Sequence, residues 1–250
     1  MTAAHPVART VGLAKAFGAH QVLAGVTLEL SEGRCTFVAG PSGTGKSVLV
    51  RHLVGLLKPD AGEVWYKDLR VDVLDEEALL GLRRRCVYVF QHPTLFDSMT
   101  VTENVALVVK YHKGVKAAAA EGLARAQLDR MGLSRLAESR PPELPAGEQK
   151  LVSLARALAL EPETLILDEP TTGLDPYAAF EIDAHVRRLK ELGVTLLVIS
   201  HDLQSIRRLA DEVVFLFDRK VRYEGGVDGF FHSADPVLDQ FVHARVEGEI

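Results

Sequence analysis

Short apolar runs recur along the chain, and most of them end in a glycine-rich or polar segment. Continuous runs of this kind are typical of strands that are covered on both faces, as in a parallel sheet. A shorter segment at 221–223 completes the same pattern. We therefore predict a sheet that is built from residues 35–39, 86–90, 165–169, 196–200 and 213–217.

The N-terminal part of the chain shows a different pattern. Residues 7–30 contain two β-like stretches separated by a turn near Gly18, and polar and apolar residues alternate clearly at 26–30. Alternation indicates a strand with one exposed face. Together with a short strand at 63–66, these stretches predict a second β region.

Helical spacing of apolar residues marks two further stretches, 75–85 and 100–132. The first ends in three arginines, which are favourable at a helix C-terminus. The second contains no strand pattern, so we interpret it as a helical subdomain inserted into an α/β core. The positions expected to face inward are Leu79, Leu80 and Leu82 in the first stretch and Leu123, Ala126, Leu128 and Met131 in the second.

Composition narrows the possible partners. The formal net charge of −5 gives no support to a nucleic-acid-binding surface, so we expect no nucleic acid partner. The two cysteines, Cys35 and Cys86, lie in apolar runs and fit core positions in a reducing compartment. Because no apolar run is long enough to cross a bilayer, any membrane role has to come through a partner.

A glycine-rich segment follows the strand at 35–39 and precedes an apolar helix. Strand, glycine-rich turn and helix start form the context of a P-loop, whose backbone N–H groups cradle phosphate. Lys46 would reach the β- and γ-phosphates of a nucleotide, and the Ser47 hydroxyl would ligate Mg²⁺. The predicted nucleotide-binding residues are Gly40, Pro41, Ser42, Gly43, Thr44, Gly45, Lys46, Ser47 and Val48.

Three other strand ends carry candidates for catalysis and metal binding. Asp168 can hold Mg²⁺ through water, and Glu169 beside it can orient or deprotonate an attacking water. Gln91 could contact Mg²⁺ or its water, and His201 could contact a γ-phosphate at the same sheet edge. From these residues alone, a surface glutamine and a structural histidine stay open as alternatives.

In this order the motifs resemble the nucleotide-binding subunit of an ABC transporter, over nearly the whole chain. Phe17 matches the aromatic position that stacks on the base, although packing under a hairpin remains the alternative. The resemblance implies ATP and Mg²⁺ as cofactors. The matches are residues 40–47 to Walker A, Gln91 to the Q-loop, Asp168 and Glu169 to Walker B and the catalytic glutamate, Leu174 and Asp175 to the D-loop, and His201 to the switch histidine. Lys46, Glu169 and His201 would then be catalytic, with Ser47, Gln91 and Asp168 at the metal.

The resemblance also implies a fold. We expect an α/β P-loop NTPase core, a mixed sheet flanked by helices, with an antiparallel β subdomain and an inserted helical subdomain. Residues 1–250 would form one nucleotide-binding domain, with the core at 1–92 and 160–228, the helical subdomain at 93–159 and a tail at 229–250.

One motif departs from the family. The signature Leu-Ser-Gly-Gly-Gln is replaced at 144–148 by Leu-Pro-Ala-Gly-Glu. In the family this segment faces the γ-phosphate held by the opposite subunit, so Gly147 is assigned to the nucleotide. Pro145 lacks the hydroxyl and the N–H donor, and Glu148 adds negative charge near a polyanion. We therefore expect weakened closure on ATP and a weakened ATP hydrolase.

Residues 94–105 and 235–243 also resemble Mla-type ATPases, which energise phospholipid or other lipid transport through permeases paired with MCE-domain proteins. The resemblance implies a peripheral subunit at the cytoplasmic face of the inner membrane. Its expected partners are a second copy of the chain, a transmembrane permease dimer and the MCE-domain protein of the same system. A heterodimer with a different cassette stays open.

Other functions within the same fold are the alternatives. The chain could serve another importer, for example of amino acids, or be a low-turnover regulatory ABC module. The intact Lys46, Asp168, Glu169 and His201 argue against the regulatory module. A soluble ABC protein of DNA repair, ribosomes or cluster assembly usually carries paired cassettes, coiled-coil insertions or basic arms, and this chain shows none of them.

Overall fold

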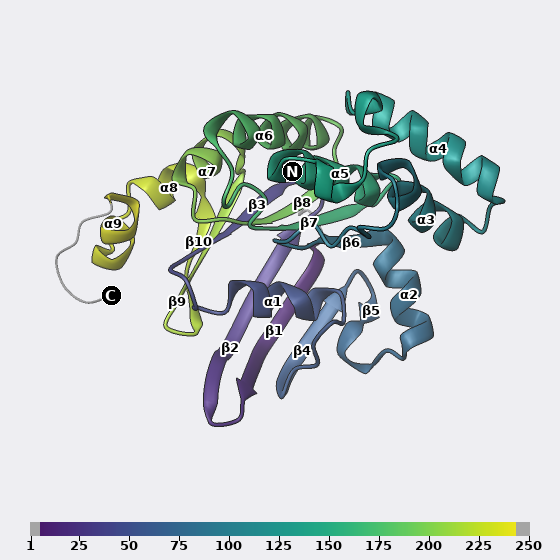
Figure 1. Ribbon diagram of the computed structural model, residues 1–250. Helices are drawn as coiled ribbons and strands as arrows, with labels where there is room; N and C mark the ends of the chain where they lie inside the picture. Colours follow the sequence, from purple (N-terminus) through teal and green to yellow (C-terminus); the bar gives the residue numbers. More distant parts are fainter. Residues whose placement is uncertain (1–5, 244–250) are drawn as a thin grey trace.

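A six-stranded mixed sheet lies at the centre of the structure, a computed structural model that describes residues 6–243 (Figure 1). The strand order is β10-β9-β3-β8-β7-β6, and neighbours are parallel except for the antiparallel β9–β10 pair. Each apolar run that predicts a strand forms one. The strands are β3 (Cys35–Ala39), β6 (Cys86–Val89), β7 (Thr164–Asp168), β8 (Thr195–Ile199), β9 (Glu212–Phe217) and β10 (Lys220–Gly226).

Both faces of this sheet are buried along β3, β7, β8 and β9, and successive apolar residues of these strands enter different cores. In β8, Leu196 and Val198 belong to one core, whereas Leu197 and Ile199 belong to the other. This alternation follows from the two-residue period of a strand. The continuous apolar runs in the sequence are therefore explained by a sheet that is covered on both sides.

A four-stranded antiparallel sheet covers one side, with α1 (Lys46–Leu53) packed between the two sheets (Figure 1). Its order is β2-β1-β4-β5, and the β1–β2 hairpin turns at Gly18, which has a φ of 60°. The second β region predicted from the sequence is thus present. Its strands are β1 (Pro6–Phe17), β2 (His20–Ser31), β4 (Ala61–Tyr66) and β5 (Leu69–Arg70), followed by the 3₁₀ helix η1 (Val71–Val73).

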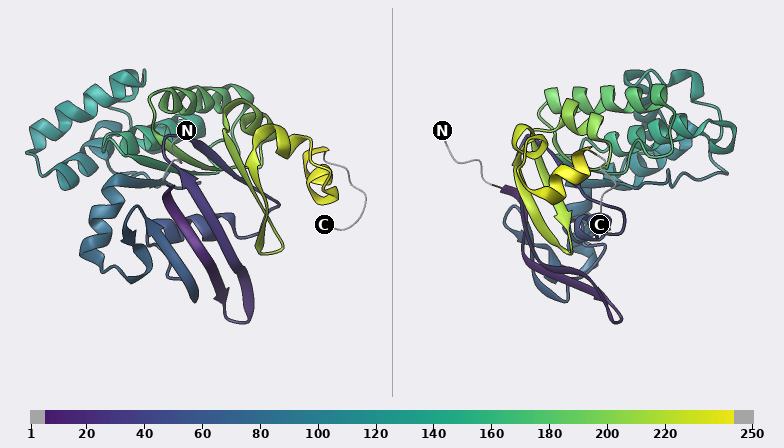
Figure 2. Two further views of the ribbon diagram at one scale, coloured as in Figure 1. Left: turned by 180° about the vertical axis from the view of Figure 1, so that it is seen from behind. Right: turned by 90° about the vertical axis from the view of Figure 1, so that its left-hand side faces the viewer.

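Helices cover the other side of the central sheet and extend beyond one end of it (Figures 1 and 2). Helices α5 and α6 lie above the sheet, while α3 and α4 project outward as a helical pair. Thr100 and Glu103 form a capping box that starts α3. The helices are α2 (Glu76–Arg85), α3 (Val101–Lys113), α4 (Ala117–Arg130), η2 (Ser134–Leu136), η3 (Pro141–Glu143), α5 (Ala146–Leu158), α6 (Pro176–Glu191) and α7 (Leu203–Leu209).

Some of the expected buried positions in these helices are wrong. Leu79 and Leu82 are buried on α2, but Leu80 is 49% exposed because it lies on the opposite side of the helix. On α4, Leu123 and Ala126 are exposed, and the buried face carries Ala120, Ala124, Gln127 and Leu128 instead. Small alanines on that face leave room for close packing against α3.

The C-terminal segment packs on β9 through aromatic rings. It contains α8 (Val227–Phe231) and α9 (Pro236–His243), and residues 244–250 of the predicted tail lie outside the described part. The ring centroids of Phe215 and Phe241 are 4.9 Å apart, and Phe230 lies within 6.1 Å of Phe215. None of the helices within 6–243 combines the length and apolar character needed to cross a membrane.

Two leucines provide a matched test of this core. Leu197 on β8 is 0% exposed, whereas Leu192 after α6 is 71% exposed. Leu197→Ala is expected to lower the free energy of unfolding by about 2–5 kcal/mol, because it leaves a cavity between the sheets. Leu192→Ala should change it by less than about 0.5 kcal/mol. Chemical unfolding followed by circular dichroism measures both, and equal losses would contradict the placement of β8.

Candidate functional site

The loop between β3 and α1 has a backbone that requires glycine at specific points. Gly40 has a φ of 147°, and a Cβ there would lie 2.3 Å from the carbonyl oxygen of Leu216. Gly45 has a φ of 95°, and a Cβ would lie 2.8 Å from Cγ1 of Val22. Because both positions combine an unusual φ with a close neighbour, the loop conformation depends on the absence of side chains.

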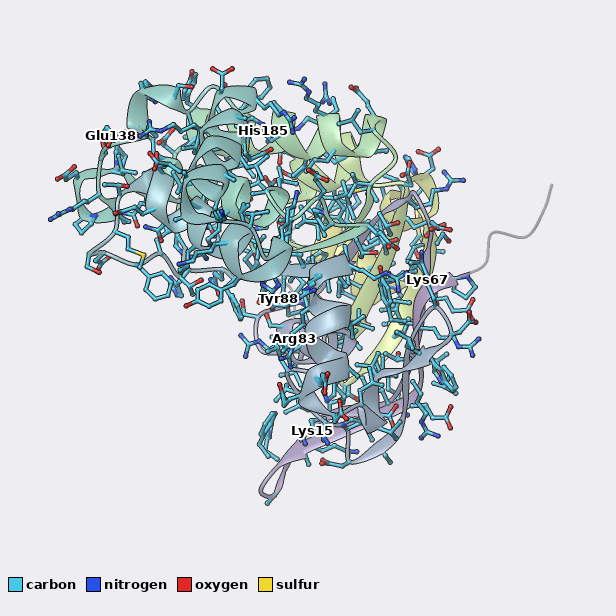
Figure 3. The ribbon with its side chains drawn as sticks, turned by 90° about the vertical axis from the view of Figure 1, so that its right-hand side faces the viewer. Lys15, Lys67, Arg83, Tyr88, Glu138 and His185 are labelled. Carbon is cyan, nitrogen blue, oxygen red and sulfur yellow. The ribbon has the colours of Figure 1, made fainter. Side chains whose placement is uncertain are left out.

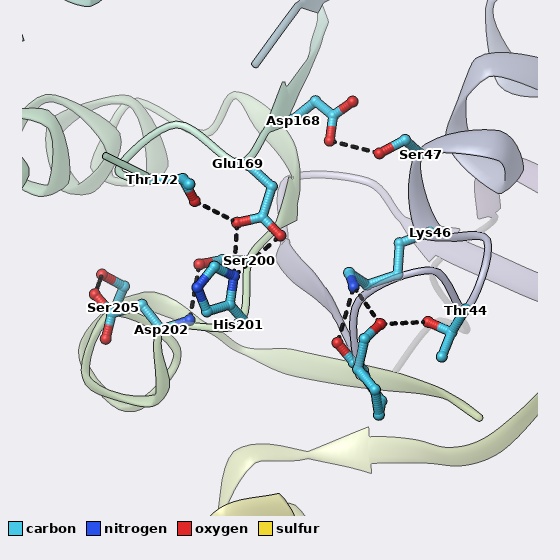
Figure 4. A network of polar contacts seen from close by, with 12 residues as sticks. Thr44, Lys46, Ser47, Asp168, Glu169, Thr172, Ser200, His201, Asp202 and Ser205 are labelled. Atoms are coloured by element: carbon cyan, nitrogen blue, oxygen red, sulfur yellow. Dashed lines mark hydrogen bonds and ion pairs between the residues drawn. The ribbon is translucent and has the colours of Figure 1, made fainter. Parts of the chain in front are cut away.

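Lys46 reaches back over this loop. Its Nζ donates to the carbonyl oxygens of Gly40 and Pro41, both at 2.8 Å (Figure 4). Burial lowers the pKa of Lys46, and the charges of Glu169 and Asp168 oppose that shift. The ammonium therefore lies inside the loop with neutral carbonyl partners, where an incoming anion would gain a buried cation.

Asp168, at the end of β7, is held from two sides. The Ser47 hydroxyl donates to its Oδ1 at 2.9 Å, and the Tyr88 hydroxyl donates to its Oδ2 at 2.5 Å. Tyr88, labelled in Figure 3, has its pKa raised by burial and by this bond, so its phenol stays protonated and remains a donor. The carboxylate is 2% exposed and fixed beside the first turn of α1.

The Glu169 carboxylate is held by two other side chains (Figure 4). The Thr172 hydroxyl donates to Oε2 at 2.7 Å, and His201 Nδ1 lies 3.0 Å from the same oxygen. The backbone of Glu169 has a φ of 49°, which is uncommon for a residue other than glycine. Two residues predicted to be catalytic from separate strands thus contact each other directly.

A cavity of about 450 Å³ brings most of the predicted residues together. Phe17, 50% exposed, lies at its edge with Lys15 Nζ 5.6 Å from the ring centroid. Gly40 and Asp168 do not line this cavity, and Pro41 and Thr44 border an adjacent hollow instead. The cavity is lined by Phe17, Val22, Ser42, Gly43, Gly45, Lys46, Ser47, Val48, Gln91, Glu169, Thr172 and His201.

The altered signature starts α5 and does not line this cavity. Gly147 packs against α6, because a Cβ on it would lie 2.7 Å from Cβ of Ala178. Glu148 forms an ion pair with Arg135 at 2.6 Å. The carboxylate of Glu148 therefore lies beside a cation from the same chain, which offsets part of the negative charge expected there.

Several residues that contact the predicted ones have little or no signal in the sequence pattern. Tyr88, Thr172 and Arg135 make the contacts given above. Lys150 on α5 donates to the carbonyl oxygens of Glu169 and Thr172. Tyr88 lies in an apolar run and Lys150 in an apolar helix, so neither has a local pattern that signals its role. Thr172 could have been suspected, since it lies three residues after Glu169.

The pattern of the ABC transporter family matches residues 23–172, more than half of the chain. This stretch contains the glycine-rich loop, Gln91, Asp168 and Glu169. The chain belongs to the ABC transporter family. Cassettes of this family are transport ATPases that work with transmembrane permease subunits, so the chain is the ATP-binding subunit of an ABC transporter.

Curated relatives within the family include importers of amino acids. The methionine import ATP-binding protein MetN of Mesorhizobium japonicum is 39% identical over 95% of this chain. The chain spans only 64% of that protein's length. The histidine/lysine/arginine/ornithine transport ATP-binding protein HisP of Escherichia coli is 35% identical, covering 95% of this chain and 97% of HisP. The chloroplast protein trigalactosyldiacylglycerol 3 of Arabidopsis thaliana is 34% identical over 94% of this chain and 73% of its own length.

Solved cassettes of ABC transporters have the same fold. A dimeric bacterial ABC transporter cassette superposes with a TM-score of 0.82 and 30% identity, over 89% of this chain and all of the cassette. A nucleotide-free ATP-binding cassette gives a TM-score of 0.83 and 28% identity over 98% of this chain and 100% of its own. These structures confirm the predicted ABC-type α/β fold with its antiparallel sheet and helical part.

Two glycines test the shape of the ABC cassette's loop. Gly40→Ala is expected to weaken binding of a fluorescent ATP analogue by about tenfold or more, because a shifted loop loses hydrogen bonds to charged phosphate. A methyl group added at Gly122 on α4 would meet only open space. Gly122→Ala should keep the Kd and raise stability by about 0.5–1 kcal/mol. An unchanged Kd for Gly40→Ala would contradict the loop geometry.

Proposed function

We propose that this cassette hydrolyses ATP–Mg²⁺ with Glu169 as the base for the attacking water, and that hydrolysis powers lipid transport through a permease. The observation that carries the proposal is the geometry of Glu169. Its carboxylate lines the same cavity as Lys46 and Ser47, and Thr172 and His201 fix its direction. A carboxylate held in this way is suited to orient and deprotonate water next to a bound phosphate.

The residues of the cavity have complementary parts in this reaction. The loop N–H groups and Lys46 bind the phosphates, and Phe17 at the cavity edge stacks on the base. His201 is bonded to Glu169 through Nδ1, which leaves its other ring nitrogen for a terminal phosphate. In this reaction the proton of the attacking water moves to Glu169, while Lys46 offsets the negative charge of the phosphates.

Mg²⁺ fits the oxygen ligands at this site. Ser47 and Asp168 lie side by side, and Gln91 lines the cavity. Among residues 6–243 there is no cluster of three or more His, Cys, Asp or Glu side chains that could hold a metal. Mg²⁺ is usually bound by one or two carboxylates plus substrate phosphates, and Asp168 beside Ser47 supplies such a carboxylate. When bound, Mg²⁺ would neutralise phosphate charge.

Lipid is the transported class that we favour. The plant relative carries the name of a galactolipid, and residues 94–105 and 235–243 resemble Mla-type ATPases. We further propose a homodimer beneath a permease dimer, at the cytoplasmic face of the inner membrane, together with an MCE-domain protein. In this arrangement residues 93–159 form a helical subdomain that is inserted into the nucleotide-binding core.

Amino-acid import is the second candidate. It is favoured by the similarity to MetN and HisP, whose names state amino-acid substrates. Both candidates use the same ATP site, because the transported molecule does not enter the cassette. The partners of the chain therefore separate the candidates.

The test is ATPase activity of the full chain purified from native membranes with its bound partners, compared with Glu169→Gln. Loss of the base is expected to lower kcat by about 100-fold or more while ATP binding is kept. Glu191→Gln, at the end of α6 and away from the cavity, is the matched control.

A co-purified permease with an MCE-domain protein, and stimulation by phospholipid, would support lipid transport. Stimulation by an amino acid with a substrate-binding protein would support the second candidate, and full activity of Glu169→Gln would contradict the assigned base.

The signature segment gives a second prediction. Pro145→Ser combined with Ala146→Gly restores a hydroxyl donor and close backbone approach, and kcat of the assembled transporter should rise by about tenfold, since a hydrogen bond to a charged group contributes ~1.5–3 kcal/mol. Because serine is also a better N-cap for α5, unfolding is measured in parallel to separate stability from turnover. An unchanged rate would show that the altered segment already binds phosphate adequately.

A further inference from the structure

Lys150 connects the first turns of α5 to the end of β7. Its Nζ donates to the carbonyl oxygen of Glu169 at 3.2 Å and to that of Thr172 at 2.8 Å. These two residues bound the short segment that follows β7 and carries the carboxylate of the site. One ammonium group therefore fixes both ends of this segment.

The segment held by Lys150 has an unusual backbone. Glu169 has a φ of 49°, in the left-handed region that residues with side chains rarely adopt. Its N–H donates to the carbonyl oxygen of Ile199 at 2.9 Å, which fixes one side of the residue to β8. Its carbonyl oxygen points to Lys150. The left-handed conformation is thus held at the N–H by the sheet and at the carbonyl by a side chain from another element.

Thr172 links the backbone contact to the carboxylate. Its carbonyl oxygen accepts from Lys150, and its hydroxyl donates to Glu169 Oε2 at 2.7 Å. Movement of this carbonyl would carry the hydroxyl with it. Lys150 consequently acts on the carboxylate by two routes, through the backbone of Glu169 and through the position of Thr172.

The surroundings of Lys150 strengthen these bonds. Its side chain borders a narrow apolar hollow that Phe90, Pro93, Leu154 and Pro170 also line. Burial lowers the pKa of Lys150, and the charge of Glu169 opposes this effect. In such surroundings an ammonium is costly unless it is hydrogen-bonded, so its two carbonyl partners are held firmly.

We propose that Lys150 is a positioning residue for ATP hydrolysis, which keeps the Glu169 carboxylate in its reactive orientation by binding the carbonyls of Glu169 and Thr172. This inference rests on the proposed hydrolysis. A purely structural lysine would tie α5 to the core and affect stability only. A positioning lysine affects the chemical step and leaves nucleotide binding intact, because it does not line the cavity that holds the loop and Lys46.

The test compares Lys150→Met, Lys150→Arg and Thr172→Val in the full chain with its co-purified membrane partners. Lys150→Met is expected to lower kcat by about 10- to 100-fold, because small misplacement of a reacting group has effects of this size. The KM and the Kd for ATP should stay within about twofold, because this variant keeps the contacts that bind ATP equally in the ground state and in the transition state. Lys150→Arg, which keeps the charge and donors, should recover part of the rate.

Lys190→Met is the matched control, because Lys190 also donates to a backbone carbonyl, that of Leu209 at 2.8 Å, away from the cavity. It should leave kcat of the folded fraction unchanged. Lys150→Met and Thr172→Val share the route through Thr172, so the double variant should lose less than the product of the two single losses.

The outcomes separate the two proposals. A wild-type complex without turnover overturns the proposed hydrolysis and this inference together. An active wild type with an unchanged kcat in Lys150→Met overturns the inference alone. A raised KM at constant kcat, or a rate loss that only follows the unfolded fraction, also overturns it, since either result makes Lys150 a binding or a structural residue.

Discussion

The parallel register of β3, β8 and β7 is the constraint on which the site depends. Val38 pairs with Ile199, and Ile199 pairs with Asp168, so three strands end at the same level of the sheet. The residues that follow them are the glycine-rich loop, His201 and Glu169. A shift of one residue would turn every side chain of a strand into the core on the other side, where it would disrupt the close packing of both cores. Positioning of the polar groups is therefore a consequence of the apolar packing beneath them.

The same sheet edge concentrates unusual backbone conformations. Gly40, Gly45 and Glu169 all have positive φ values, and each lies where a strand or loop turns toward the cavity. Glycine adopts such values without strain, whereas Glu169 keeps its conformation only because its surroundings hold it in place, and all three residues have close contacts here. Gly40 lies against Leu216, Gly45 lies against Val22, and Glu169 is fixed by β8 and by Lys150. The backbone at these three positions is thus held by contacts within the chain itself.

Local patterns were sufficient to predict the strands, the glycine-rich loop and the strand-end polar residues, because each depends on a few consecutive positions. The burial of Leu80 and Leu123 was predicted wrongly, since these helices carry more apolar residues than one packed face can take, and only the neighbouring helix decides which face is used. Tyr88 and Lys150 were missed for a related reason. The partner of Tyr88 is 80 residues away in the chain, and the two partners of Lys150 are 19 and 22 residues away. Only the fold brings such residues together. Nothing in a single sequence marks them.

The altered signature is compatible with the fold even where it departs from the family. Pro145 occupies the N-cap of α5, where no helical hydrogen bond needs its missing N–H. Gly147 is required by its contact with Ala178, and Arg135 balances the charge of Glu148. Proline gives no side-chain cap, so no side chain at the N-cap accepts from the N–H groups of the first turn. The departure is therefore accommodated by the local contacts of α5, and it changes only which groups lie at the start of this helix.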